Sequence, residues 1–529
     1  MYFTGTILTV AEAAVTPLSP GTSEQERVIS TESVEVVPPE PTYPVSGAQP
    51  GRSQYRRPFT MQNAPDPKRW FALALLCLTG FMIILDASIV LVAVPSIERD
   101  LTFSAGGVQW VPSGYALMFG GLLLLGGRIS DLLGRRRVFI AGLLLFAASS
   151  LLCGFAWTGD ALVFARGLQG IAAAVLAPSA LSIVMTTFPD GAERNKALGI
   201  WGATSGVGGT AGSLVGGPVT DGLGWQWIFF INVPVCLLVA VLAPVLLKDS
   251  RGPGRRGFDL AGAVTVTAAL IVLVYAVIEA PTSSAGRTTL LALGSAVLFG
   301  LFVLVEQRSA APLVPLRLFR SRALVGGNLI TISWGLGAFG LNFIYTQYAQ
   351  LALGVSAIRY GLMSSVLAAA AVCGSILGQN LVTRIGVRPV AAGSLVLAGI
   401  GSTVMSRLSV DSGYFELAFW GLTIFGAGLG AGTVAGAIAA LSDVGGEDAG
   451  VASGLQNASF QIGGAVGIAI LSAVAVGQTT GPSPGQLVSG YRVAFAACWA
   501  FVAVGLIGTS LLIGKKRLAP QQAEPAQAR

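Results

Sequence analysis

The feature of this sequence that most restricts its fold is a series of long apolar segments separated by short polar loops. An α-helix rises 1.5 Å per residue, so about 20 apolar residues cross the ~30 Å hydrocarbon core of a bilayer. Inside that core every backbone N–H and C=O group must be bonded within the protein, and a helix achieves this along its whole length. The series therefore predicts an all-α integral membrane protein that is embedded in the lipid bilayer.

Fourteen apolar segments follow one another after residue 68. Because fourteen is an even number, both ends of the series are expected on the same side of the membrane. The predicted helices cover residues 70–94, 108–126, 138–157, 161–187, 197–221, 225–247, 258–279, 288–305, 323–353, 357–382, 388–408, 414–441, 449–476 and 490–513.

Composition and charge agree with a membrane protein. Only 11% of the residues are charged, whereas an ordinary soluble domain has about 25% charged residues. The net charge of +7 does not indicate a nucleic-acid partner, because the basic residues occur in short clusters between apolar segments. Those clusters report the orientation of the chain in the membrane.

Lys and Arg residues are unequally divided between the two sets of loops. If the N-terminus is cytoplasmic, 21 of them fall in inner loops and five in outer loops, and such a bias sets the topology of multi-pass proteins. We therefore expect a multi-pass membrane protein with both termini in the cytoplasm. The outer-loop residues are Arg99, Arg287, Arg359, Arg407 and Arg492.

The two ends of the chain differ from the apolar segments between them. Residues 1–67 are polar and contain several prolines, so we expect a disordered cytoplasmic extension there, and residues 519–529 form a cytoplasmic tail. The first residues lack a basic stretch ahead of an apolar one, so a cleaved signal peptide is not expected. Met61 precedes the first predicted helix and is an alternative start of the native protein.

The sequence gives no indication of a cofactor, and we expect a transporter rather than an enzyme. There is no His, and the five Cys residues show no paired spacing, which argues against zinc and haem sites. The Gly514-Lys515 step continues with a second Lys instead of Ser or Thr, so no ATP-binding loop is expected. The glycines from Gly426 to Gly432 lie inside an apolar segment with no preceding strand, which favours helix packing over dinucleotide binding.

The loop between the second and third predicted helices is rich in glycine and charge. The stretch GGRISDLLGRRRVF contains Gly127, Asp131, Gly134, Arg135 and Arg136. Arginines alone suffice for orientation, but Gly134 also permits a tight turn, and Asp131 can pair with an arginine or meet a helix N-terminus. The spacing resembles the signature loop of the major facilitator superfamily, in which a glycine precedes an aspartate by four residues and Gly-Arg-Arg follows.

The resemblance implies a fold and a domain organisation. Two six-helix bundles with two extra central helices are expected, which gives 14 transmembrane helices. The N-terminal bundle would cover residues 68–248, the linker helices 249–308 and the C-terminal bundle 309–518. The stretch GQNLVTRIGVR between helices ten and eleven echoes the signature loop weakly, with Thr383 at the place of Asp131.

Other segments are similar to the fourteen-span drug:proton antiporters of this family. In the first helix, LDASIVLVAVPSI matches that branch at Asp86 and Pro95 but has Leu91 where the branch usually has asparagine. In the fourth helix, LVFARGLQGIAAA matches the element Arg-x-x-Gln-Gly at Arg166 and Gln169. The resemblance implies that Asp86, Arg166 and Gln169 act in proton coupling or substrate binding.

The fifth predicted helix carries a glycine pattern similar to the antiporter motif, in the stretch GVGGTAGSLVGGPVTD. Glycine at every fourth position gives a flat surface for a neighbouring helix, so ordinary packing competes with the gating interface that the resemblance implies. The motif's Gly-Pro pair is replaced by Gly-Ser, and a proline follows later. The residues concerned are Gly208, Gly212, Gly216, Gly217 and Pro218.

Asp86 lies deep in the first helix, where an ionised carboxylate is costly to bury. It must face the protein interior or a cavity, either in a fixed ion pair or as the group that binds a proton or a cationic substrate. Arg166 has corresponding alternatives, a static strut or a coupling residue. Asp221, Glu279 and Glu416 fall near predicted helix ends, where a solvated charge is expected.

Together with these features, the resemblance implies a proton-driven exporter of amphipathic or cationic drugs in the bacterial inner (plasma) membrane, which works by alternating access between two bundles. A dedicated exporter of one metabolite, antibiotic or peptide is an alternative, and a non-transporting membrane sensor is another. Protons and small drug-like molecules are the expected partners, without ATP. Aromatic and amide side chains of the ninth helix are candidates to line the cavity, namely Tyr345, Gln347, Tyr348 and Gln350.

Overall fold

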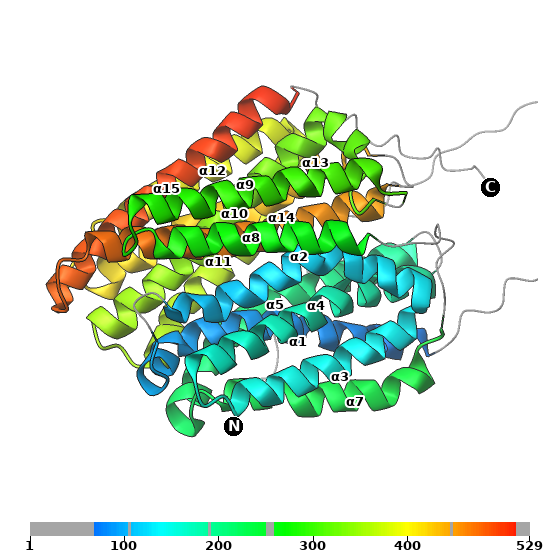
Figure 1. Ribbon diagram of the computed structural model, residues 1–529, viewed down its shortest axis with the longest axis horizontal. Coiled ribbons are helices and arrows are strands. Elements are labelled where there is room, and N and C mark those ends of the chain that lie inside the picture. Colours follow the sequence, from blue (N-terminus) through cyan, green and yellow to red (C-terminus); the bar gives the residue numbers. More distant parts are fainter. Residues whose placement is uncertain are drawn as a thin grey trace, which may run out of the picture. The chain divides into compact units, whose positions relative to one another are not determined.

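The computed structural model describes residues 68–103, 107–188, 192–249, 259–310, 312–444 and 448–514. The predictions for residues 1–67 and 519–529 lie outside these ranges. In the described part, long helices run side by side along one axis, and their connections gather at the two ends of the bundle (Figure 1). We call the end that holds Lys68 and Gly514 the termini-side end and the opposite end the far end.

Fourteen long helical spans are present in the described residues, as the sequence predicts, if α6 and α7 are counted as one. Short segments also occur: the 3-10 helices η1 (Gly107–Gln109) and η2 (Leu316–Arg320), and the π-helical η3 (Tyr348–Ala352) and η4 (Tyr414–Ala418). The α-helices are α1 (Arg69–Asp100), α2 (Trp110–Leu133), α3 (Arg135–Gly154), α4 (Gly159–Thr187), α5 (Ala192–Leu223), α6 (Trp227–Phe230), α7 (Asn232–Leu246), α8 (Leu260–Glu279), α9 (Ala285–Arg308), α10 (Arg322–Gln347), α11 (Ala357–Ile385), α12 (Val387–Met405), α13 (Phe419–Leu441), α14 (Ala449–Gln478) and α15 (Pro484–Leu512).

Thirteen spans among the described residues are long and apolar enough to cross a membrane, and α5 is the helix that falls outside this set. Nine of its 32 residues are glycine, and its first turns are charged, so its mean hydropathy is low although its length suffices. Other helices extend past their apolar segments: α15 begins at Pro484 because Ser483 and Gln486 form a capping box ahead of the apolar run.

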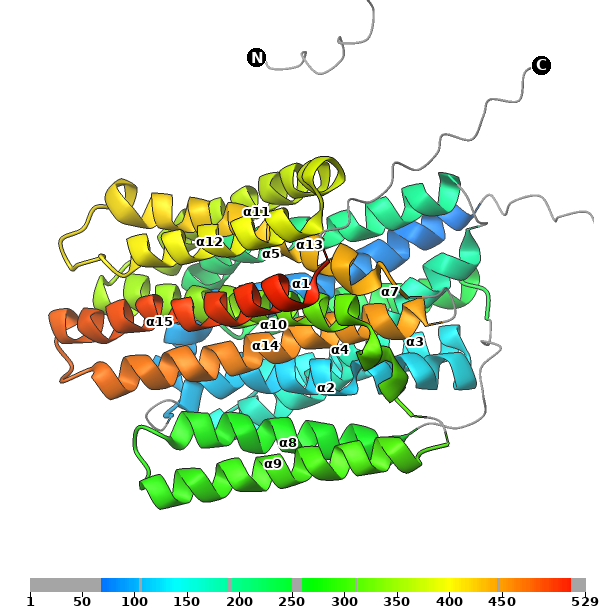
Figure 2. The same ribbon diagram turned by 90° about the horizontal axis from the view of Figure 1, so that it is seen from above.

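The helices pack in two groups with a hairpin beside them. We call α1–α7 the N-half and α10–α15 the C-half; within them α1 packs on α5, α2 on α4, α10 on α14 and α11 on α13. The groups meet where α5 packs on α11 and α2 on α14. Helices α8 and α9 form a hairpin at one edge, where α8 contacts both α2 and α14 (Figure 2).

Close helix contacts depend on glycine at several crossings, since a methyl group in its place would overlap the neighbouring backbone. A Cβ atom at Gly126 of α2 would overlap the carbonyl group of Ala174 in α4. A Cβ atom at Gly170 of α4 would likewise overlap the carbonyl oxygen of Tyr115 in α2. The pair α2 and α4 is therefore held at a distance that only small residues permit, as is usual for helices in membranes.

We expect Gly126→Ala to lower the thermal unfolding temperature of the purified protein, because the added methyl group forces α2 away from α4. Overpacking of this kind costs about 1–3 kcal/mol. Gly294→Ala in α9 is the matched control, since a Cβ atom there would have no neighbour within 4 Å. Equal unfolding temperatures for both variants would contradict the tight α2/α4 contact.

Candidate functional site

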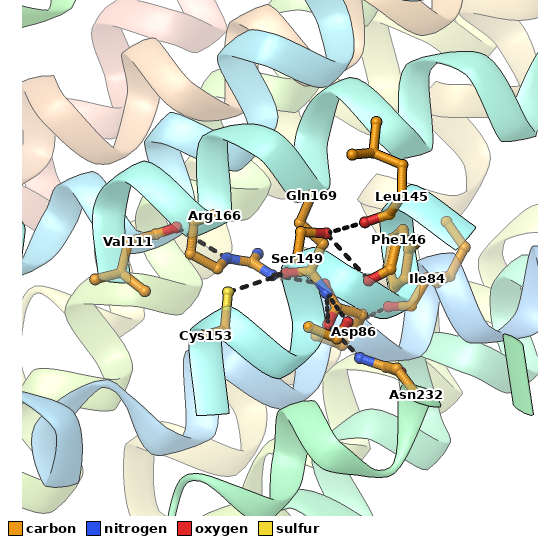
Figure 3. Close-up of polar contacts among 12 residues, drawn as sticks. Ile84, Asp86, Val111, Leu145, Phe146, Ser149, Cys153, Arg166, Gln169 and Asn232 are labelled. Atoms are coloured by element: carbon orange, nitrogen blue, oxygen red, sulfur yellow. Dashed lines mark hydrogen bonds and ion pairs between the residues drawn. The ribbon is translucent and has the colours of Figure 1, made fainter. Parts of the chain in front are cut away.

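Asp86 lies in the middle of α1 with its side chain fully buried inside the N-half. Its Oδ2 accepts a hydrogen bond of 2.6 Å from Arg166 Nη1, which is also an ion pair. Its Oδ1 accepts hydrogen bonds from Gln169 Nε2 at 2.9 Å and from Asn232 Nδ2 at 2.8 Å (Figure 3). Donors from α4 and α7 therefore converge on one carboxylate of α1.

Arg166 is 1% exposed and is held by groups from several helices. Its Nε donates to the carbonyl oxygen of Val111 in α2 at 3.2 Å. Its guanidinium carbon lies 4.2 Å from the ring centre of Tyr115 and 5.7 Å from that of Phe229. An aromatic face attracts a cation in this geometry, so the charge is compensated by Asp86 and by the two rings.

Gln169 completes the cluster, and its amide is oriented by its partners on both sides. Its Oε1 accepts from Arg166 Nη1 at 2.6 Å, and its Nε2 donates to Ser150 Oγ of α3 at 2.8 Å. Arg166 and Gln169 are three residues apart in α4 and therefore share one face of that helix. We call Asp86, Ser150, Arg166, Gln169 and Asn232 the buried polar cluster.

The structure brings together all three residues that the sequence predicted for coupling, and it adds residues that the prediction missed. Asn232 is the first residue of α7, next to the break between α6 and α7 at Ile231. It lies in the stretch WQWIFFINVP, where an amide side chain follows an apolar run. This pattern is the sequence signal that could have identified Asn232. Ser150 and Tyr115 gave no such signal, since Ser and Tyr are common in membrane helices.

The α2–α3 loop lies at the termini-side end and makes contacts only partly foreseen. Gly134 has φ +106° and connects the two helices without a longer turn, as its sequence position suggested. Asp131 Oδ1 accepts from Arg135 Nε at 2.9 Å and Nη2 at 2.8 Å. Arg136 Nη1 donates to the carbonyl oxygen of Leu247 at 3.1 Å, just past the end of α7. Gly127 packs against Pro178 of α4.

The glycines of α5 face two different neighbours. Gly208, Gly212 and Gly216 contact α1, where added Cβ atoms would crowd the side chains or backbone of residues 81–92. Gly217 contacts α11 instead, because a Cβ atom there would overlap the backbone at Ala357 and Ile358. Pro218 follows within the helix. One part of the motif thus packs inside the N-half and another part touches the C-half.

Four hydrogen bonds between described residues of the two halves lie in the far-end portion of the bundle. Asp221 Oδ2 of α5 accepts from the backbone N–H of Ile358 at 3.0 Å, at the start of α11. Two amides of the C-half donate to α1: Gln350 to the Val92 carbonyl oxygen at 2.8 Å and Gln347 to Glu98 Oε2 at 3.3 Å. A fourth bond, from Ser113 Oγ to the Ala465 carbonyl oxygen, measures 3.4 Å.

The four residues suggested as cavity lining therefore divide into two pairs. Gln347 and Gln350 lie at the interface between the halves. Tyr345 and Tyr348 are buried within the C-half, where their rings stack at 6.2 Å and Tyr348 donates to the Ser409 carbonyl oxygen at 2.9 Å. Side chains at the end of α10 and in η3 therefore face either the interface between the halves or the interior of the C-half.

One face of α5 also shows where the two halves separate. Gly199 precedes Gly217 by five helical turns and so lies on the same face, about 27 Å nearer the termini-side end. A Cβ atom at Gly199 would have no neighbour within 4 Å, whereas one at Gly217 would overlap α11. The face of α5 that touches the C-half at the far end is therefore open at the termini-side end.

Comparison with known proteins agrees with this architecture. The family model of the Major Facilitator Superfamily matches residues 76–325 and 328–528. The puromycin resistance protein pur8 of Streptomyces alboniger is 36% identical over 461 residues, which cover 85% of this chain and 92% of that protein. The cephamycin export protein CmcT of Amycolatopsis lactamdurans is 37% identical over 456 residues, which cover 85% of this chain and 93% of that protein.

A solved structure shares the fold. It is a bacterial homologue of the human lysosomal transporter Spinster in an inward-facing and unoccupied conformation, with a TM-score of 0.62 and 18% sequence identity. The match covers 86% of this chain and 100% of that chain.

We expect Arg166→Gln to destabilise the protein strongly, because it leaves the buried Asp86 carboxylate without its cation. Removing one partner of a buried ion pair costs about 3–5 kcal/mol. The double variant Asp86→Asn/Arg166→Gln should recover part of this loss, since neither charge remains. Thermal unfolding of Arg166→Gln, Asp86→Asn and the double variant in detergent measures the coupling. Losses that simply add in the double variant would contradict a direct interaction.

Proposed function

The chain belongs to the major facilitator superfamily, and we propose that it is a proton-coupled exporter of amphipathic or cationic drug-like molecules. The resistance and export proteins named above support export, since they match most of this chain and most of their own length. The buried ion pair of Asp86 and Arg166 is the observation that carries proton coupling. We assign the protein to a bacterial inner membrane.

We place the termini-side end in the cytoplasm. Four arginines lie there at helix starts, namely Arg135, Arg136, Arg322 and Arg388. Lys and Arg residues favour the cytoplasmic side of a membrane. The far end, where Asp221 contacts α11, then faces the outside.

Transport proceeds by alternating access in this proposal. The bundle at residues 68–248 and the bundle at 309–518 move against each other, with the linker helices of 249–308 alongside. The hydrogen bonds of Asp221, Gln347 and Gln350 between the halves support a conformation that is closed on the outside. The open face of α5 at Gly199 supports access from the cytoplasm.

Coupling follows from competition for the Asp86 carboxylate. In the structure, Arg166 donates to Oδ2 of Asp86, and Gln169 and Asn232 donate to Oδ1. A proton that binds Asp86 removes its negative charge and therefore weakens its hold on Arg166. The freed guanidinium, still bonded toward α2, then repositions α4 relative to α1. A permanent structural pair would bind no proton in the transport cycle.

Dedicated export of one compound is the second candidate. The relative CmcT carries cephamycin export in its name, and pur8 carries puromycin resistance, so each of these relatives is named for a single compound. A susceptibility screen of a pump-deleted host that expresses this chain separates the two. Resistance to many unrelated compounds supports multidrug export, and resistance to one supports dedicated export.

We expect Asp86→Asn to abolish uphill efflux while facilitated downhill flux persists, because asparagine imitates the protonated carboxyl permanently. Asp86→Glu should keep part of the activity. Efflux from energised cells, with and without a protonophore, measures uphill transport by each variant. Substrate-induced proton release from the purified protein measures the coupling to protons. Glu279→Gln is the control, since Glu279 contacts Ser283 and Arg287 at the end of α8. Uphill pumping with proton release in Asp86→Asn would make Asp86 structural.

We expect Asp131→Asn to shift the population toward inward-facing states, because it removes the charge that holds the α2–α3 loop in a cytoplasmic latch. Its two bonds with Arg135 show that the carboxylate is already engaged by an arginine. Labelling of a cysteine placed at position 199 from the cytoplasmic side reads out the population. An unchanged labelling rate would leave only the topological role of this loop.

A further inference from the structure

A hollow of about 410 Å³ lies at the termini-side end of the C-half, away from the buried polar cluster. Its wall contains Arg322 at the start of α10, Arg388 near the start of α12 and Asp443 just after α13. The last turn of α15 and the residues after it, from Ser510 to Gly514, complete the wall. We call this hollow the C-half pocket.

The charged side chains that line the C-half pocket, all within the described residues, form no ion pairs with one another. In the described part of the chain, neither the Arg322 guanidinium nor the Asp443 carboxylate has an ion-pair or hydrogen-bond partner. Arg388 donates from Nη2 to the Ser510 carbonyl oxygen at 2.8 Å, which leaves other N–H donors of its guanidinium available. Two cations and one anion therefore face a common space without pairing across it.

Helix ends divide the pocket into an anion-binding and a cation-binding side. Arg322 and Arg388 stand at the N-termini of α10 and α12, where the helix dipole is positive and a phosphate is favoured. Asp443 follows the C-terminus of α13, where the dipole is negative and a cation is favoured. A ligand with a phosphate at one end and an ammonium group at the other satisfies both sides.

The wall also contains apolar side chains at the end of α15, namely Leu511, Leu512 and Ile513. The pocket lies at the ends of membrane-spanning helices, the depth at which phospholipid headgroups meet a membrane protein. We propose that the C-half pocket binds the headgroup of phosphatidylethanolamine, with its phosphate on Arg322 and Arg388, its ammonium group on Asp443 and its acyl chains along α15. This site does not depend on the proton coupling proposed above.

Native mass spectrometry of the purified full-length protein tests the proposal with phosphatidylethanolamine and phosphatidylglycerol of identical acyl chains. Wild-type protein should retain the ethanolamine lipid more tightly. The variant Arg322→Gln/Arg388→Gln should lose about tenfold or more in affinity for both lipids, because charge-assisted hydrogen bonds are lost. Asp443→Asn should remove the preference for the ethanolamine lipid and keep phosphatidylglycerol binding.

Arg384→Gln is the matched control, because Arg384 lies at the same end of the C-half, in the last turn of α11, and does not line the pocket. It should bind both lipids as wild-type protein does. Ethanolamine-lipid binding that survives in Arg322→Gln/Arg388→Gln would overturn the site. Equal binding of both lipids by wild-type protein, unchanged in Asp443→Asn, would overturn the assignment of the ammonium group.

Discussion

The pairing of Asp86 with Arg166 is the interaction on which the N-half depends. Each charge alone would be prohibitively costly in a membrane interior, and together they become tolerable only when further hydrogen bonds satisfy both groups. The N-half supplies those bonds from α2, α3, α4 and α7, so four helices are fixed around one carboxylate of α1. In the proposed mechanism a single proton on Asp86 disturbs this arrangement, because the buried carboxylate and guanidinium compensate each other's charge.

Tight helix contacts give this cluster its rigid surroundings. The α2/α4 crossing at Gly126 and Gly170 and the α1/α5 crossing at Gly212 leave no room for a methyl group. Because lipid tails are as apolar as the helices, such close packing and buried hydrogen bonds hold membrane helices together. Small residues therefore determine which helices pack most closely, and the buried polar cluster adds hydrogen bonds between them.

Much of this organisation follows from the sequence, because a bilayer imposes a length and a polarity on each helix. The fourteen spans were predictable from apolar runs, and these include α5, although its apolar content falls short of that of the other spans. A shared role of Asp86, Arg166 and Gln169 was expected through the resemblance. The contribution of Asn232 was not, since it depends on the break at Ile231 that turns α7 toward α1. The division between Gln347 and Tyr348 also required the three-dimensional register of α10 and η3.

Helix α1 connects Asp86, the proposed proton-binding residue, with the contact between the halves. Asp86 and Glu98 are 12 residues apart on it, about 18 Å along one continuous helix. The same helix offers the Val92 carbonyl oxygen to Gln350 and packs against the glycines of α5, and α5 in turn carries Asp221 to the start of α11. Under the proposed mechanism, a change in the Asp86–Arg166 distance moves a helix pair whose far end contacts the C-half. Rigid-body tilting of α1 with α5 would then relate protonation of Asp86 to opening at the far end, without a separate chain of side-chain rearrangements.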